Sequence, residues 1–144
     1  MKIIKARACD LDIIADFENK YFSHPYSKEL IIKTLKNENY LIVIATKDGS
    51  PAGYAEFGYF IDSVSVDRVC VSYGFRRQGI AKMLLAEGEK WAKRLMCNTM
   101  TLEVRSQNSA AVALYEKSGY ILYSRRSHYY TCPKDDALIY TKLL

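Results

Sequence analysis

The sequence predicts one α/β (α+β) domain over residues 1–144, in which a mixed sheet carries helices on both faces. Segments rich in β-branched residues alternate with segments whose apolar residues recur at helical spacing, and glycine or proline turns separate them. Strand–helix–strand units beside a hairpin favour a sheet that mixes parallel with antiparallel strands. A chain of 144 residues can bury such a core without disulfides or metal.

The first third predicts a strand followed by two helices. An apolar stretch at 2–6 is a short strand, and Asp10 is a plausible N-cap for an amphipathic helix that ends near Lys20. The residue before a proline avoids helical backbone, so the step from His24 to Pro25 should break the pattern. Ser27 can then cap a second helix.

A hairpin is predicted next. Residues 40–46 form a nearly continuous apolar run, which is typical of a buried strand. The turn sequence at 47–51 contains Asp, Gly, Ser and Pro, and residues 52–60 return as another strand. Two strands joined by so short a turn pair antiparallel.

The central unit joins a β-branched strand, from about Val64 to Val71, to a helix from Gly79 to about Leu95. The short turn between them contains Gly74 and Gly79. The first N–H groups of a helix lack backbone partners, and with the positive end of the helix dipole they form a seat for phosphate oxygens. The two glycines could also serve only to turn the chain.

The C-terminal part predicts a strand, a helix and two strands. Asn98 is expected to close the central helix, and residues 99–104 alternate as a strand. Asn108 is expected to begin a short helix that Gly119 ends. The last two strands are expected at 120–123 and 137–143.

Charge and cysteine content narrow the class of protein. The net charge of +5 suits an anionic partner, either a cofactor with several phosphates or something attached to RNA. Four scattered cysteines and two histidines show no zinc-ligand spacing, so no metal is expected. No signal peptide and no apolar run of membrane-spanning length is evident, so the expectation is a cytoplasmic protein without membrane attachment.

The spacing Arg76-x-x-Gly79-x-Ala81, directly after a strand, resembles the acetyl-CoA signature of the GNAT acetyltransferases. The order of elements resembles that fold throughout the chain, which implies a mainly antiparallel sheet. The resemblance implies that amides around Arg77, Gly79 and Ala81 hold the pyrophosphate of acetyl-CoA, with Arg76 beside them. It also implies that the backbone of Val69 and Val71 runs along the pantetheine arm.

Two further segments are similar to GNAT motifs. Leu102-Glu103-Val104-Arg105 resembles a strand of RimI-type protein N-acetyltransferases, in which the glutamate is regarded as the general base. The segment that runs from Asn108 to Tyr120 resembles the second cofactor motif, which implies that Asn108 contacts pantetheine and that the Tyr115 hydroxyl meets the sulfur. A phenol is a weaker acid than a thiol, so Tyr115 should act mainly as a hydrogen-bond donor.

The substrate side also resembles the RimI group. Tyr26 and Ser27 precede the second helix as in its substrate loop, and Tyr129 and Tyr130 match its double tyrosine. Those enzymes acetylate the N-terminal alanine of a small-subunit ribosomal protein. The resemblance implies the same class of acceptor, a protein N-terminus, and no stable nucleic-acid complex.

Three alternatives remain open on the sequence. One is a GNAT enzyme that acts on a small amine or antibiotic. Another is a binding module for RNA or the ribosome, with a basic and aromatic surface formed by Tyr123, Arg125, Arg126, Tyr129 and Tyr130. The third is a cysteine–histidine acyl enzyme that uses Cys70 or Cys132.

Overall fold

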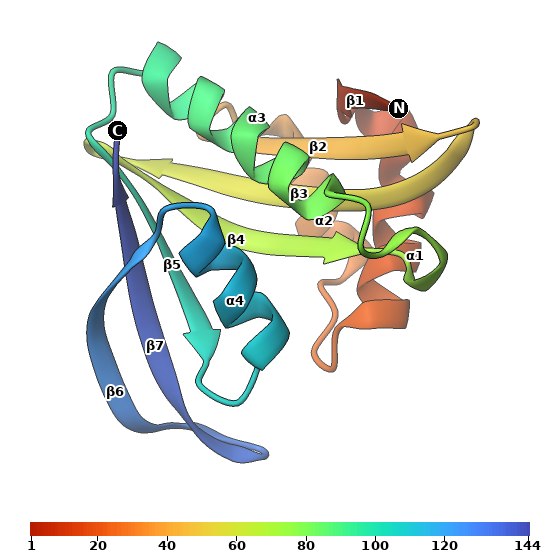
Figure 1. The fold of residues 1–144 in the computed structure, drawn as a ribbon. Helices are drawn as coiled ribbons and strands as arrows, with labels where there is room; N and C mark the ends of the chain where they lie inside the picture. Colours follow the sequence, from red (N-terminus) through yellow and green to blue (C-terminus); the bar gives the residue numbers. More distant parts are fainter.

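The computed structural model describes residues 1–144 as a seven-stranded sheet with helices on both faces (Figure 1). The strand order is β1-β2-β3-β4-β5-β7-β6, and only the β4–β5 pair is parallel. The helices and strands are β1 (Lys2–Lys5), α1 (Leu11–Tyr21), α2 (Lys28–Lys36), β2 (Tyr40–Lys47), β3 (Ser50–Phe60), β4 (Ser63–Val71), α3 (Ile80–Arg94), β5 (Thr99–Arg105), α4 (Ser109–Lys117), β6 (Ile121–Thr131) and β7 (Lys134–Leu143). This confirms the predicted fold class and order of elements.

The core lies in two layers, one on each face of the sheet. Alternate residues of β2 contribute to opposite layers: Leu41 and Val43 face α3, whereas Ile42 and Ile44 face α1 and α2. A strand buried on both faces reads as a continuous apolar run, which explains residues 41–45. Figure 1 shows α3 and α4 on one side of the sheet and α1 and α2 on the other.

Helix α3 packs very closely on the sheet at Gly88. A Cβ atom built there would lie 2.2 Å from the Phe57 ring of β3, so only glycine fits at this point. Ile80, Leu84 and Leu85 bury the apolar stripe of the helix, as its periodicity predicts. This close packing fixes the start of α3 beside the end of β4.

The helix boundaries differ from the prediction at two points. Asp10 does not cap α1 with its side chain; a short 3₁₀ turn precedes the helix, and the Asp10 carboxylate accepts a hydrogen bond from the Arg7 N–H at 2.8 Å. Helix α3 ends at Arg94, and Met96 turns the chain with a φ of 62°, so Asn98 lies beyond the helix. In each case a local turn takes over the role expected of the polar side chain.

The last two strands are longer than predicted. Strand β6 extends to Thr131 and β7 begins at Lys134, so the hairpin includes the basic and aromatic segment 125–130. Strand β6 is exposed along almost its whole length, and its pairing with β7 shifts register twice. An exposed edge strand with bulges shows no buried alternation, which is why the sequence indicated only its first residues.

Candidate active site

The site begins where β4 and β5 separate. The two parallel strands are paired at only three positions, the last being Ser65 with Thr101, and beyond this point they diverge. Each divergent end keeps an antiparallel partner on its outer side, β3 for β4 and β7 for β5. The divergence opens a cleft on each face of the sheet.

The first cleft lies on the face that carries α3 and α4, and we call it the α3–α4 cleft. Its volume is about 890 Å³. It is lined by every residue that the sequence assigned to cofactor binding, together with the predicted catalytic tyrosine: Val69, Val71, Arg76, Arg77, Gly79, Ala81, Asn108 and Tyr115. Residues from β4, the following turn and α4 therefore meet in one cavity.

The turn into α3 has the geometry of an anion site. Arg77 and Gly79 both adopt left-handed backbone, with φ of 63° and 78°, and Gly79 is the N-cap of α3. The backbone N–H groups of Arg77, Gln78 and Gly79 donate to no protein acceptor. Nothing lies within 4 Å of a Cβ atom built on Gly79, so the space above this backbone is open. The turn can therefore donate several hydrogen bonds to phosphate oxygens.

The two arginines of the turn are arranged differently. The Arg76 guanidinium folds back, donating from Nε to the Val71 carbonyl at 3.1 Å and stacking 4.0 Å from the centre of the Tyr73 ring. Arg77 forms no ion pair and is exposed at the mouth of the cleft, as is Lys82 in the first turn of α3. The free cationic charge of the turn thus comes from Arg77 and Lys82.

Helix α4 supplies the other wall of the cleft. The Asn108 side chain caps it, with Oδ1 accepting from the Ala111 N–H at 3.3 Å. Tyr115, two turns later, packs edge-on to Tyr120 with ring centres 5.9 Å apart. Burial raises the pKa of Tyr115 to about 12, and its hydroxyl has no protein partner. The tyrosine is therefore protonated and free to donate a hydrogen bond within the cleft.

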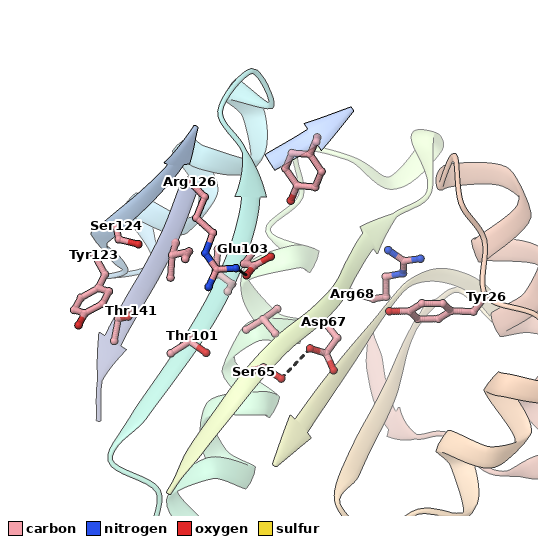
Figure 2. Close-up of a pocket in the computed structure, with 14 residues that line it drawn as sticks. Tyr26, Ser65, Asp67, Arg68, Thr101, Glu103, Tyr123, Ser124, Arg126 and Thr141 are labelled. Carbon is pink, nitrogen blue, oxygen red and sulfur yellow. Dashed lines mark hydrogen bonds and ion pairs between the residues drawn. The ribbon is translucent and has the colours of Figure 1, made fainter. Parts of the chain in front are cut away.

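The second cleft lies on the opposite face, between β4 and β7, and we call it the β4–β7 cleft. It has a volume of about 830 Å³, and Glu103 points into it from β5 (Figure 2). The Glu103 carboxylate is 41% exposed and has one weak ion pair, at 3.7 Å, with Arg126 of β6. Its neighbours Leu102 and Val104 are buried on the other face, as the predicted alternation requires. Glu103 can accept a proton from a group bound in this cleft.

Two of the four residues predicted to bind substrate line the β4–β7 cleft. Tyr26 forms its wall next to α1, and Tyr130 lies at the β6–β7 end, where Arg105 stacks 4.0 Å from the ring centre. Ser27 lines neither cleft; it caps α2 by accepting from the Leu30 N–H at 3.2 Å. Tyr129 is also outside the lining and packs against the edge of Tyr130.

Asp67 and Arg68, which were not predicted from the sequence, both line the β4–β7 cleft. A β-bulge at Asp67 places these consecutive side chains on the same face, since Phe57 pairs with Val66 and Glu56 with Arg68. The sequence does indicate this bulge, because the apolar residues Val66 and Val69, which face the same layer of the core, are three positions apart. Regular alternation along a strand would place them two apart. Desolvation raises the pKa of the Asp67 carboxyl, which accepts a hydrogen bond from Ser65 at 2.8 Å.

The cysteines do not form an acyl-enzyme site. Cys70 is buried, and burial raises the pKa of its thiol to about 12, so it is not a thiolate at neutral pH. Cys132 is exposed, and neither cysteine shares a hydrogen bond with a histidine. No group of three or more His, Cys, Asp or Glu side chains is placed to hold a metal ion.

The two clefts are adjacent along both strands. Along β4, Arg68 lines the β4–β7 cleft and the next residue, Val69, lines the α3–α4 cleft. Along β5, Glu103 lines the β4–β7 cleft, whereas Arg105 lines the α3–α4 cleft and donates a hydrogen bond to the Pro133 carbonyl of the β6–β7 hairpin. The anion-binding turn on one face of the sheet and the Glu103 carboxylate on the other therefore both lie beside the gap between β4 and β5. This arrangement suits an enzyme that transfers a group from a phosphate-bearing donor on one face of the sheet to an acceptor on the other.

Comparisons with known proteins agree. The model of the Acetyltransferase (GNAT) family matches residues 11–120. The ribosomal protein bS18-alanine N-acetyltransferase of Escherichia coli (strain K12) is 30% identical over 132 residues, which cover 90% of this chain and 88% of the relative. The chain therefore belongs to the GNAT family and is an acetyl-CoA-dependent N-acetyltransferase. The non-enzymatic RNA-binding alternative is set aside by this membership.

Solved structures show the same fold. The crystal structure of the E. coli ribosomal-protein-S18-alanine N-acetyltransferase matches with a TM-score of 0.88 and 28% identity, covering 99% of this chain and 92% of that chain. Arabidopsis thaliana NAA60 in complex with acetyl-CoA matches with a TM-score of 0.87 and 17% identity, covering 99% and 98%. No helix of the protein has the length and apolar character needed to span a membrane.

Proposed function

We propose that this enzyme acetylates the N-terminal α-amine of a protein, in the cytoplasm, and that its acceptor is a small-subunit ribosomal protein beginning with alanine. The observation that carries the proposal is the position of Glu103 in the β4–β7 cleft, on the opposite face from the anion seat. Relatives such as the E. coli enzyme are named for acetylation of the bS18 alanine, which supports the same acceptor class here.

The α3–α4 cleft fits acetyl-CoA, which would supply the acetyl group as a thioester. The unpartnered amides of Arg77, Gln78 and Gly79 and the nearby cations suit its phosphates. Val69 and Val71 offer the inner edge of β4, since β5 has already diverged from it. Asn108 and Tyr115 would hold the other end of the cofactor from α4.

The chain's own groups have separate chemical roles in this proposal. Glu103 takes the proton from the acceptor amine, directly or through one water. The Tyr115 hydroxyl donates a hydrogen bond to the negative charge that develops in the α3–α4 cleft, and its raised pKa keeps it protonated for this role. Tyr26 and Tyr130 form two walls of the cleft that receives the acceptor, with Ser27 and Tyr129 close to them in sequence.

An α-amine suits a single carboxylate base better than a lysine does. An α-amino group has a pKa near ~8, so removing its proton at pH 7 costs roughly 1.4 kcal/mol. A lysine with a pKa near ~10.4 costs roughly 4.6 kcal/mol. Two carboxylates line this cleft, Glu103 and Asp67, and Asp67 already accepts a hydrogen bond from Ser65, so Glu103 is the one left free to take the proton of an α-amine.

The test is acetylation of three acceptors by the purified enzyme with acetyl-CoA. A peptide that begins with alanine should react at least about tenfold faster than the same peptide with a blocked N-terminus and a free lysine. A polyamine is the third acceptor. If the blocked peptide or the polyamine reacts best, the proposal is wrong and the small-amine alternative replaces it. Intact-mass spectra of ribosomal proteins from cells with and without the enzyme identify the natural acceptor.

A further inference from the structure

We propose that Arg68 is a positioning residue that holds the loop between α1 and α2 across the junction of the two clefts, and so aligns the acceptor with the donor. The inference rests on the proposed function, because it assigns the acceptor to the β4–β7 cleft. Arg68 does not touch the reacting atoms in this proposal; it acts through the loop residues 22–26.

The Arg68 guanidinium is held by five contacts. Its Nε and Nη2 donate to the two carboxylate oxygens of Glu18 at 3.2 and 3.1 Å, and Nη2 also donates to the His24 carbonyl at 3.1 Å. The rings of Phe22 and Tyr26 lie over the guanidinium, with their centres 4.1 and 3.9 Å away. Figure 2 shows Arg68 beside the Tyr26 ring at the edge of the cleft. One side chain of β4 thus fixes three residues of the loop.

Glu18 anchors this arrangement from α1. It is fully buried, and besides Arg68 it accepts hydrogen bonds from the Tyr54 hydroxyl and from the Tyr26 N–H, the latter at 2.9 Å. Both carboxylate oxygens therefore have two donors each, so the carboxylate has one orientation. A charge buried to this degree is tolerated only when it is paired, which makes Arg68 necessary to Glu18 as well.

The loop fixed by Arg68 contributes to both clefts. Phe22 lines the α3–α4 cleft, where the donor is expected, and Tyr26 lines the β4–β7 cleft, where the acceptor is expected. The guanidinium lies against both of these rings, so the relative position of the two walls depends on it. Group transfer requires the two reactants within about 3–3.5 Å, and a displacement of about 1 Å can cost roughly a hundredfold in rate.

Lysine cannot reproduce this arrangement. An ammonium group has no planar fork for two carboxylate oxygens and no flat face to stack between two rings. Arg68→Lys keeps the positive charge beside Glu18, so the variant separates charge from geometry. A matched control is Lys28→Gln. It breaks an exposed ion pair between α2 and α1, in which Lys28 Nζ lies 3.0 Å from Asp12 Oδ1.

The experiment compares both variants with the wild-type enzyme. For Arg68→Lys we expect kcat/KM for the alanine peptide to fall at least about tenfold, with the Kd of acetyl-CoA within about threefold of wild type, since the phosphate turn is untouched. Lys28→Gln should leave kcat/KM within about twofold, because exposed ion pairs contribute little. The melting temperature of each variant is measured in parallel.

A second variant addresses the loop itself, because Arg68→Lys could also reduce folding. Tyr26→Leu removes one of the two rings over the guanidinium and leaves the pairing of Arg68 with Glu18. We expect Tyr26→Leu to lose kcat/KM as Arg68→Lys does, and the double variant to lose less than the product of the single losses, since both changes act on the same contact.

Two results overturn the inference. One is a lower melting temperature for Arg68→Lys with unchanged kcat/KM for the peptide, which would make the contacts purely structural. The other is unchanged hydrogen exchange of the amides of residues 22–26, since loss of the contacts should accelerate it at least about tenfold. The exchange measurement needs no acceptor. If the wild-type enzyme acetylates no peptide, the proposed function fails, and hydrogen exchange still decides the role of Arg68.

Discussion

Glu56→Gln should stabilise the protein, and more so as the pH rises. Glu56 lies in the middle of β3 and is only 5% exposed, and its carboxylate has no hydrogen bond or ion pair. Burial, helped by the negative charges of Asp67 and Glu18, raises the pKa of its carboxyl from 4.5 to about 7. Glutamine has the shape of the protonated acid and no charge to lose.

The sign and size follow from proton linkage. A raised pKa means that the folded protein keeps a proton that the unfolded chain releases, so stability falls as the pH rises from about 4.5 through 7. At 1.36 kcal/mol per pKa unit, the penalty is under about 1 kcal/mol at pH 5 and roughly 3 kcal/mol at pH 8. Glu56→Gln removes this penalty and should raise the melting temperature at pH 8 by roughly 5–10 °C.

The assay is thermal unfolding of wild type and Glu56→Gln at pH 5 and pH 8, monitored by circular dichroism at constant ionic strength. The control is Glu38→Gln, a change at an exposed residue, which should shift both melting temperatures by less than about 2 °C. If the gain from Glu56→Gln is the same at both pH values, or is largest at pH 5, the assignment of a proton to Glu56 is wrong.

Four further substitutions test the site and the core. Gly79→Val should weaken acetyl-CoA binding at least about tenfold, as measured by calorimetry. The φ of this residue is 78°, and the branched side chain would project into the open space above the phosphate turn. Unchanged affinity would refute the site. Glu103→Gln should depress kcat most at low pH, where the amine is hardest to deprotonate. Tyr115→Phe should lower kcat across the whole pH range. If both variants lose cofactor affinity equally, Glu103 and Tyr115 are structural residues. Gly88→Ala should lower stability by about 1–3 kcal/mol, because its Cβ would collide with the Phe57 ring at 2.2 Å, and an unchanged melting temperature would contradict the packing.

The parts of the molecule that the sequence predicts well are those that local residues determine. The turn from β4 into α3 is specified by residues 76–81 themselves, and all the assigned cofactor residues line one cleft. The alternation around Glu103 likewise places its side chain on the face opposite the buried Leu102 and Val104. These features depend on backbone periodicity and turn chemistry within a few residues.

The parts that were missed depend on contacts distant in sequence. Arg68 meets Glu18 across a separation of 50 residues, and nothing in either segment alone indicates the pair. Ser27 carried two predictions: the predicted N-cap of α2 is confirmed, whereas its role in substrate binding stays a prediction, since it lines neither cleft. The full length of β6 was missed since an exposed edge strand has no buried periodicity to detect.

The short pairing of β4 with β5 has a mechanical consequence. The sheet consists of a four-stranded antiparallel part, β1 to β4, and a three-stranded part, β5 to β7, and only three residue pairs join them in the plane of the sheet. A ligand inserted where the strands diverge contacts both parts and acts as an additional tie between them. At a concentration a hundred times its Kd, such a ligand adds about 2.7 kcal/mol to the stability of the folded state. If acetyl-CoA binds in this gap as proposed, it also ties the two parts of the sheet together, and these parts are least firmly joined between product release and the next binding event.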